Sequence, residues 1–569
     1  MTKYILYKKQ TLSIVICIFS LFISCSDNVL VETPLDFLSP EIAYNSVEGF
    51  EQGINGLHER VRANYYYGYN DTQSQLYGIG TDVAFQGEDP GSTRWLNDYT
   101  TFLRPDNPWT SWPWNNEYNQ VQRANLIIKS IETSSDEIWE NEAQKNALLA
   151  EVKFFRAFSY RLLTYLYGDV PLITEPVTTA KADFVRNPIS EVFSQMKEDL
   201  LFAVSNLPAP GNEKASGRIT QGAAWHMLSE LYIRTGENQL AVDAASKVID
   251  GFNYKLMTQR FGTKLGKDIL GSGDVYFDLF GYGNHNLSEN TEAIWVVQVE
   301  PLITGGGNNT GERAWGPAYF RIGNTPDGFK AILGEFVNGV YTTYSDTLGR
   351  SVGWFSPTNY LKYDIWKSDW DNDIRNAEHN IKRNFYYDNP ESAYHGHKID
   401  FNLYPPGTRD PNKDTISYIY PYWMKFADPL NHFTEEARSG GGNNHKDIYA
   451  IRLAETLLLR AEAYVNLGKK DLAAEDINKI RIRANGKPVL PQDVDIDYIL
   501  DERARELYGE EFRNITLRRT GKLIERTRKY NNNPKIPGAN IEEYHNLYPI
   551  PLAAIDLNID AKIEQNPGY

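Results

Sequence analysis

An acidic cluster near the middle of the chain is the first place where its residues could do chemistry. Residues 369–373, with the sequence DWDND, begin like a calcium-binding loop, which supplies side-chain oxygens at alternate positions. However, Ile374 stands where the sharp turn requires glycine, and Asn380 stands where a bidentate glutamate belongs. The segment is therefore predicted to be a solvated acidic loop.

Other motifs of catalysis are incomplete. Residues 262–268 have the wrong spacing and ending for a phosphate-binding loop, and His395 and His397 lack a third metal ligand. Neither the His-Glu-x-x-His nor the Gly-x-Ser-x-Gly pattern occurs. We therefore predict no catalytic residue, no metal and no cofactor. A glycoside hydrolase stays open, because its two carboxyl groups need only be about 5 to 9 Å apart in space.

The two cysteines, Cys17 and Cys25, both lie in the first 25 residues, which excludes disulfides and thiolate catalysis from the rest of the chain. Three lysines precede an apolar run over residues 12–23, which is too short to span a bilayer as a helix and is typical of a secretory signal. Residues 21–25, LFISC, resemble a bacterial lipobox, although Phe22 stands where leucine is usual. We predict a signal peptide over 1–24, lipidation of Cys25 and a tether over 25–40.

Composition indicates a large globular protein that does not bind nucleic acid. The 569 residues include 41% hydrophobic side chains, and 58 basic and 74 acidic groups give a net charge of −16. Affinity for a polyanion comes from an excess of lysine and arginine, which this chain lacks. Its 37 tyrosines suggest flat, half-exposed surfaces.

Four stretches have the apolar spacing of amphipathic helices, at about 115–133, 141–167, 219–250 and 449–484. The last two share the spacing Tyr-x3-Gly-x3-Leu-Ala, in which glycine permits a turn and alanine a close helix contact. This spacing resembles a tetratricopeptide-type helix pair. A helical scaffold is therefore expected over about 41–250 and 449–569.

A loop-rich part of 198 residues, 251–448, separates the two helix pairs. It holds 23 of the 42 glycines and six of the 12 tryptophans, and residues 292–299 are its clearest predicted strand. Long loops on a rigid scaffold often carry binding residues. Ligand binding is therefore predicted in this part.

Several motifs resemble the SusD/RagB family of nutrient-binding lipoproteins of Bacteroidetes. The most specific are AEVKFFRA at 150–157 and YGDVPLI at 167–173. The further matches, in chain order, are Arg218–Thr220, Arg452–Glu455, Ala461–Tyr464, Asn478–Arg483, Glu502–Leu507, Leu517–Arg519, Tyr548–Pro551 and Gln565–Tyr569. Glu511, Thr516 and Thr520 depart from the residues that are usual there.

The resemblance implies a mainly α-helical, SusD-like fold with few short strands, forming one domain over 41–569. It also implies a palmitate-bearing, cell-surface lipoprotein of the outer membrane. Such a protein captures a polysaccharide or oligosaccharide and passes it to a SusC-like TonB-dependent transporter, without catalysis. A RagB-like peptide receptor, an extracellular glycoside hydrolase and a helical-repeat scaffold for partner proteins are the alternatives.

The arginines and glutamates of the family motifs are expected to form ion pairs that fix helix packing, not to bind ligand. Arg503 and Glu506, for example, are three residues apart on one helix face.

The ligand site is instead predicted from aromatic rings, which can stack on the apolar face of a sugar, and from polar side chains that can bond to its hydroxyl groups. The candidates are Trp95, Asn97, Asp98, Arg313, Trp315, Tyr319 and Trp354. Trp114 and Trp225 are expected in the core.

Overall fold

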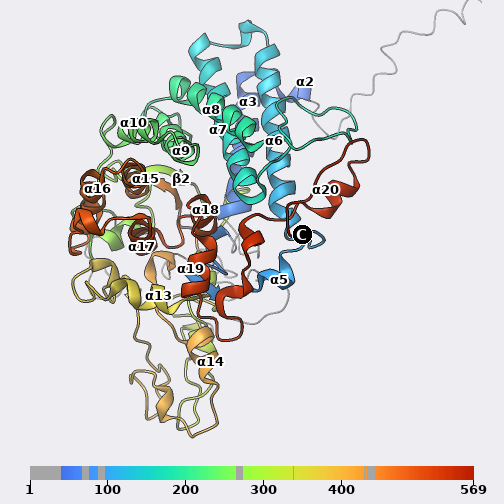
Figure 1. The fold of residues 1–569 in the computed structure, drawn as a ribbon. Coiled ribbons are helices and arrows are strands. Elements are labelled where there is room, and N and C mark those ends of the chain that lie inside the picture. The colour runs from blue at the N-terminus through green and yellow to red at the C-terminus, as the bar shows by residue number, and fades with distance from the viewer. Residues whose placement is uncertain are drawn as a thin grey trace, which may run out of the picture.

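The structure is a computed structural model, and it describes residues 40–66, 76–87, 97–263, 273–337, 339–345, 347–428, 431 and 443–569. Helices from both ends of the chain stack side by side, and the loop-rich part extends from one end of this stack (Figure 1). The first residues of the chain, including Cys25 and the expected signal peptide and tether, lie outside the described residues.

The N-terminal helices pack in sequence order. They are α3 (Val47–Val61), α6 (Ser111–Thr133), α7 (Glu142–Tyr167) and α8 (Ile189–Asn206). The predicted helices at 115–133 and 141–167 are confirmed as α6 and α7. The chain leaves α7 at Gly168, whose φ of +77° favours glycine. Trp114 is buried near the start of α6, as expected.

Two helix pairs form the centre of the stack, as the repeated spacing predicts. They are α9 (Gln221–Arg234) with α10 (Asn238–Ile249), and α15 (Leu453–Asn466) with α16 (Lys470–Arg483). Gly236 and Gly468 make the two turns, with φ of +79° and +74°. Because α10 packs against α15, the two pairs become neighbours although the loop-rich part separates them in the sequence.

The C-terminal helices close the scaffold over the earlier ones. They are α17 (Ile496–Leu507), α18 (Arg513–Arg519), α19 (Leu523–Tyr530) and α20 (Leu552–Asp556). Helix α17 packs against α15, and α18 packs against α7. Among the described residues, no helix combines the length and the apolar character needed to cross a membrane.

All strands of the described chain are short and form antiparallel pairs. The pairs are β1 (Ala84–Gln86) with β5 (Phe355–Pro357), β2 (Ala293–Val297) with β8 (Ile448–Arg452), β3 (Phe336–Val337) with β4 (Val340–Tyr341), and β6 (Ile381–Lys382) with β7 (Tyr422–Trp423). The predicted strand at 292–299 is confirmed as β2. The fold class is therefore mainly α with few short strands, as expected.

The loop-rich part has short helices and small hydrophobic cores of its own. Its helices are α11 (Val275–Leu279), α12 (Gly311–Trp315), α13 (Asn359–Lys362) and α14 (Pro411–Lys413). One core gathers Tyr319, Phe385 and Tyr422, and is separate from the core between the scaffold helices.

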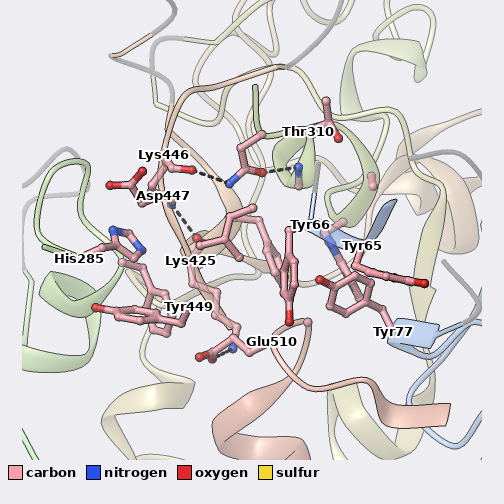
Figure 2. Close-up of a pocket in the computed structure, with 18 of the residues that line it drawn as sticks. Tyr65, Tyr66, Tyr77, His285, Thr310, Lys425, Lys446, Asp447, Tyr449 and Glu510 are labelled. Carbon is pink, nitrogen blue, oxygen red and sulfur yellow. Dashed lines mark hydrogen bonds and ion pairs between the residues drawn. The ribbon is translucent and has the colours of Figure 1, made fainter. Parts of the chain in front are cut away.

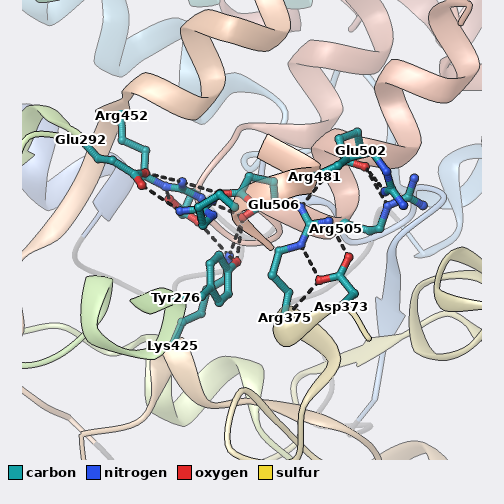
Figure 3. A network of polar contacts seen from close by, with 12 residues as sticks. Tyr276, Glu292, Asp373, Arg375, Lys425, Arg452, Arg481, Glu502, Arg505 and Glu506 are labelled. Atoms are coloured by element: carbon teal, nitrogen blue, oxygen red, sulfur yellow. Dashed lines mark hydrogen bonds and ion pairs between the residues drawn. The ribbon is translucent and has the colours of Figure 1, made fainter. Parts of the chain in front are cut away.

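A buried network of ion pairs joins the loop-rich part to the end of β8, to α16 and to α17 (Figure 3). Glu506 accepts hydrogen bonds from Arg452 (2.6 Å), Arg375 (2.9 Å) and Arg483. Burial alone would raise the pKa of Glu506, but the three guanidinium groups hold it well below its usual value. This carboxylate therefore stays charged and fixes three segments that are far apart in sequence.

The predicted structural role of the motif arginines is confirmed, but the proposed partner of Arg503 is wrong. Arg503 bonds to Glu455 on α15 (2.5 Å) and to Glu511 (2.6 Å) instead of Glu506. Arg503 reaches these partners because its long side chain extends from α17 to neighbouring elements. The spacing of residues along one helix does not reveal such partners.

A second buried ion cluster connects the two ends of the described chain. Asp82 accepts hydrogen bonds from Arg513 on α18 (2.6 and 3.0 Å) and from Arg526 on α19 (2.7 Å). The two guanidinium groups outweigh the effect of burial and lower the pKa of Asp82 to about 2. A residue early in the sequence is thereby fixed to the last helices.

Candidate functional site

A small cavity lies between the scaffold and the loop-rich part (Figure 2). Its volume is about 70 Å³, and it is lined by tyrosines of the N-terminal region and by Lys425, Lys446 and Glu510. Lys425 donates to Glu510 (2.8 Å), and Lys446 donates to the backbone carbonyl of Lys425 (2.6 Å). These charged groups therefore hold loops together, and the cavity is too small for a sugar chain.

Two titratable groups at the cavity have shifted pKa values for structural reasons. Burial raises the pKa of Asp447 to about 6, although its carboxylate accepts from the backbone N–H of Val299 (2.8 Å). Burial and the nearby Lys446 lower the pKa of His285 to about 3. Within the described part of the chain, no group of three or more His, Cys, Asp or Glu could hold a metal ion.

Trp315 lies at this cavity, but its ring faces are covered. The centre of the Phe355 ring is 4.0 Å from the centre of the Trp315 ring, at an interplanar angle of 23°. The centre of the Phe426 ring is 4.8 Å from it, at an angle of 13°. Only 6% of Trp315 is exposed. The prediction that Trp315 stacks on a ligand is therefore corrected: neighbouring rings of the loop-rich part already occupy its planes.

Tyr319 is also a core residue. It is 2% exposed, and its hydroxyl donates a hydrogen bond to the backbone carbonyl of Gly349. Burial raises its pKa well above the usual value. Its predicted contact with ligand is corrected for the same reason as that of Trp315, because the ring is enclosed by the core around Phe385 and Tyr422.

Trp354 and Arg313 lie together at a half-buried position. The Arg313 guanidinium carbon is 5.1 Å from the centre of the Trp354 ring, within the range of a cation–π contact. The backbone supports this pair, because the N–H of Val352 donates to the carbonyl of Arg313 (2.9 Å). Trp354 therefore has a preferred orientation, partly packed against the core cluster that contains Trp315.

Strand β1 brings Asn97 to the same junction. The Asn97 side-chain oxygen accepts from the N–H of Gln86 (3.2 Å), and the N–H of the next residue, Gly87, donates to the carbonyl of Trp354 (2.9 Å). Asn97 and Trp354 therefore lie on either side of the end of β1. We call Asn97, Arg313 and Trp354 the β1 junction.

Asp98 has a local structural role. Its carboxylate caps the short helix α5 (Tyr99–Phe102) and accepts from the N–H (3.1 Å) and hydroxyl (2.8 Å) of Thr101. Burial alone would raise its pKa, but these hydrogen bonds hold it below the usual value. Trp95, the remaining predicted residue of this cluster, lies outside the described residues.

Arg321 and Arg350 lie against the ring of Phe320, next to the predicted residue Tyr319, and they were not predicted from the sequence. The guanidinium carbons of Arg350 and Arg321 are 4.5 and 5.4 Å from the centre of the Phe320 ring. Burial lowers the pKa of Arg350, and the positive charges of Arg313 and Arg321 lower it further. The sequence Tyr-Phe-Arg at 319–321 could have indicated Arg321, because it places an arginine directly after two aromatic residues.

Comparison with solved structures defines the class of fold. A laminarin-binding SusD-like protein has a TM-score of 0.64 at 22% identity, covering 92% of this chain and 100% of that one. Surface glycan-binding protein A from Bacteroides fluxus has a TM-score of 0.63 at 18% identity, covering 92% and 99%. The stacked helix pairs with their docked loop-rich part are thus a SusD-like fold.

The family follows from sequence. A model described as "SusD family" matches residues 291–569, and one described as "Starch-binding associating with outer membrane" matches residues 38–233. The chain is 26% identical to SusD-like protein P25 of Formosa agariphila, covering 96% of both chains. It is also 26% identical to starch-binding protein SusD of Bacteroides thetaiotaomicron, covering 82% of this chain and 79% of that one.

The chain therefore belongs to the SusD family, a family of glycan-binding proteins associated with the outer membrane. Two of these relatives are named for the glycans that they bind, starch and laminarin.

Proposed function

We propose that this protein is a cell-surface lipoprotein that binds a glycan and delivers it to a SusC-like TonB-dependent transporter. Family membership supports the ligand class. The β1 junction carries the proposal in this chain, because its half-buried indole, Trp354, lies against the Arg313 guanidinium. Asn97 is only 9% exposed and its oxygen already accepts from Gln86, so it supports the strand. The indole can cover the apolar face of a sugar ring, and the guanidinium can bond to its hydroxyl groups.

No catalytic step is proposed. Many buried carboxylates of the scaffold, such as Glu506 and Asp82, are bound by two or three guanidinium groups each. A carboxylate held in this way is a poor general acid, because its pKa lies well below neutral pH. Incubation with starch or laminarin should release no new reducing ends.

Native affinity gel electrophoresis tests the binding site. Wild-type protein should be retarded in gels that contain soluble starch, laminarin or alginate, and Trp354→Ala should bind the retarding polymer about tenfold more weakly. Tyr341→Ala, which removes an exposed ring on β4, is the matched control and should behave as wild type. Unchanged retention of Trp354→Ala would overturn the β1 junction as the site.

The lipid anchor and the transporter have their own tests. Cys25→Ala should abolish labelling of the protein by radioactive palmitate and release it from the outer membrane. Wild-type protein extracted in mild detergent should co-purify with one large β-barrel protein. Recovery of several unrelated proteins instead would favour a general scaffold.

A further inference from the structure

The acidic loop at 369–373 displays an exposed tryptophan. Trp370 is 40% exposed, whereas Asp369 and Asp373 are 5% and 2% exposed. The surrounding contacts fix the chain on both sides of this ring, so the indole is held in an exposed position.

Both acidic ends of the loop are held by ion pairs. Asp369 accepts from Arg481 on α16 (2.6 Å) and from the N–H of Lys487 (2.8 Å). Asp373 accepts from Arg375 (2.6 Å), which also donates to Glu502 on α17 (2.8 Å; Figure 3). The carboxylates that resemble calcium ligands in the sequence are therefore bound to arginines, and the loop is attached to the scaffold.

Asn376 connects the loop to a guanidinium that lies against the indole. Its side-chain amide donates to the carbonyl of Trp370 (2.7 Å), and its side-chain oxygen accepts from Nη2 of Arg383 (2.5 Å). The guanidinium carbon of Arg383 is 4.6 Å from the centre of the indole. Burial lowers the pKa of Arg383 to about 10, so it remains charged at neutral pH and holds one face of the ring by a cation–π contact.

A second exposed ring lies beside the first. Tyr363 follows helix α13 and is 45% exposed, and its ring centre is 6.4 Å from that of Trp370, at an interplanar angle of 21°. Arg383 also lies 5.9 Å from the Tyr363 ring. The two rings therefore present planes of nearly the same orientation within one small patch, with their positions fixed in advance of any ligand.

We propose that Tyr363, Trp370 and Arg383 form a second carbohydrate-binding platform, separate from the β1 junction, that takes a pyranose ring of a polysaccharide. We call these three residues the Trp370 platform. The rings would cover the apolar C–H face of the sugar, and Arg383 is a positioning residue that holds the indole. The proposal rests on the proposed function only in sharing its ligand class.

The neighbouring side chains favour a sugar over an acyl chain. Asp364 and Lys367, which pair at 2.7 Å, and Asp371 and Asn372 are exposed on the same short stretch of chain. Charged and amide groups around flat rings suit a ligand with an apolar face and a rim of hydroxyl groups. Fixing the rings beforehand also lowers the entropy cost of binding, which matters for a weak, repeated ligand such as a polymer.

Affinity gels with the full chain and the same three polysaccharides test the platform. Trp370→Ala and Tyr363→Ala should each bind the retarding polymer about three- to tenfold more weakly. Arg383→Lys keeps the positive charge but loses the planar contact with the indole, and it should weaken binding of the polymer less than the two ring variants do. Tyr341→Ala, whose ring is as exposed as that of Tyr363, should bind as wild type. Urea unfolding midpoints should match wild type for the ring variants, because both rings are exposed.

The outcomes separate the two proposals. If Trp354→Ala loses retention while Trp370→Ala and Tyr363→Ala keep it, the Trp370 platform is overturned and the β1 junction stands. If only the platform variants lose retention, the platform stands and the β1 junction is overturned. If no polymer of the set retards the wild-type protein, both proposals fail.

Discussion

The helical scaffold and the loop-rich part solve the problem of positioning side chains in different ways. In the scaffold, buried arginines and carboxylates connect helices that are far apart in sequence. In the loop-rich part, small aromatic cores and short strand pairs hold the chain. Exposed aromatic rings are concentrated in the loop-rich part, which has six of them. The rest of the described chain has two, Phe102 and Tyr544. The six are Phe329, Phe336, Tyr341, Tyr363, Trp370 and Tyr386.

This difference teaches that aromatic content alone does not locate a binding site. Trp315 and Trp370 both belong to the loop-rich part, yet one is enclosed by Phe355 and Phe426 and the other is displayed by a fixed loop. We expect the rings that face a ligand to be those that the surrounding structure supports without covering both faces.

The largest expected effect comes from breaking the scaffold network. Glu506→Ala leaves three buried guanidinium groups without their shared partner, which should cost about 3 to 5 kcal/mol of unfolding free energy. Urea denaturation followed by far-UV circular dichroism measures it. Glu525→Ala, which removes an exposed partner of Lys522, is the control and should cost less than about 1 kcal/mol. Equal losses in the two variants would contradict the distinction between buried and exposed pairs.

A somewhat smaller effect should separate the two kinds of tryptophan. Trp315→Ala removes a ring packed between two others and should destabilise the fold by about 3 kcal/mol or more. Trp370→Ala should change stability by less than about 1 kcal/mol, because its ring is exposed. Thermal unfolding of the two variants gives the comparison. A large loss for Trp370→Ala would show that its ring has a structural role.

The smallest expected effect, for a change of one pH unit, is a dependence of stability on pH that comes from a buried carboxyl group of the scaffold. Glu117 on α6 is buried, and burial raises its pKa to about 8 although the positive charge of Arg60 acts in the opposite direction. Between about pH 4.5 and pH 8 the folded chain therefore holds a proton that the unfolded chain has lost. Stability should fall as pH rises through this window, by at most about 1.4 kcal/mol per pH unit.

Glu117→Gln should make this slope shallower, because an amide does not titrate. Urea unfolding at pH 5, 6.5 and 8 measures the slope in both proteins. The two slopes would coincide if Glu117 were ionised in the folded state.

The sequence predicted the regular part of the fold well. The repeated Tyr-Gly-Leu-Ala spacing correctly placed both helix pairs, since local periodicity and a turn glycine determine such hairpins. Helix α8 was missed, although its apolar residues, such as Val192, Phe193, Met196 and Leu200, have helical spacing. The partner of Arg503 could not be found from the sequence, because it depends on how helices cross.

The candidate site was harder to predict for a related reason. Burial of Trp315 depends on rings that are 40 and 111 residues away along the chain, at Phe355 and Phe426. Nothing in the local sequence distinguishes it from Trp354. The prediction of a solvated acidic loop at 369–373 is wrong for Asp369 and Asp373, which are buried in ion pairs. One of their partners, Arg481, is far away in the sequence, so local residues could not reveal it.

The bonds between Asp82 and the arginines of α18 and α19 also constrain the order of events during biosynthesis. A chain that is still emerging from the ribosome or from a secretion pore has made Asp82 long before Arg513 and Arg526. The N-terminal segment must therefore wait, with this acidic group in water, until the final helices arrive. The native state is therefore completed late in synthesis, and a chain that terminates before Arg513 and Arg526 cannot complete this ion cluster.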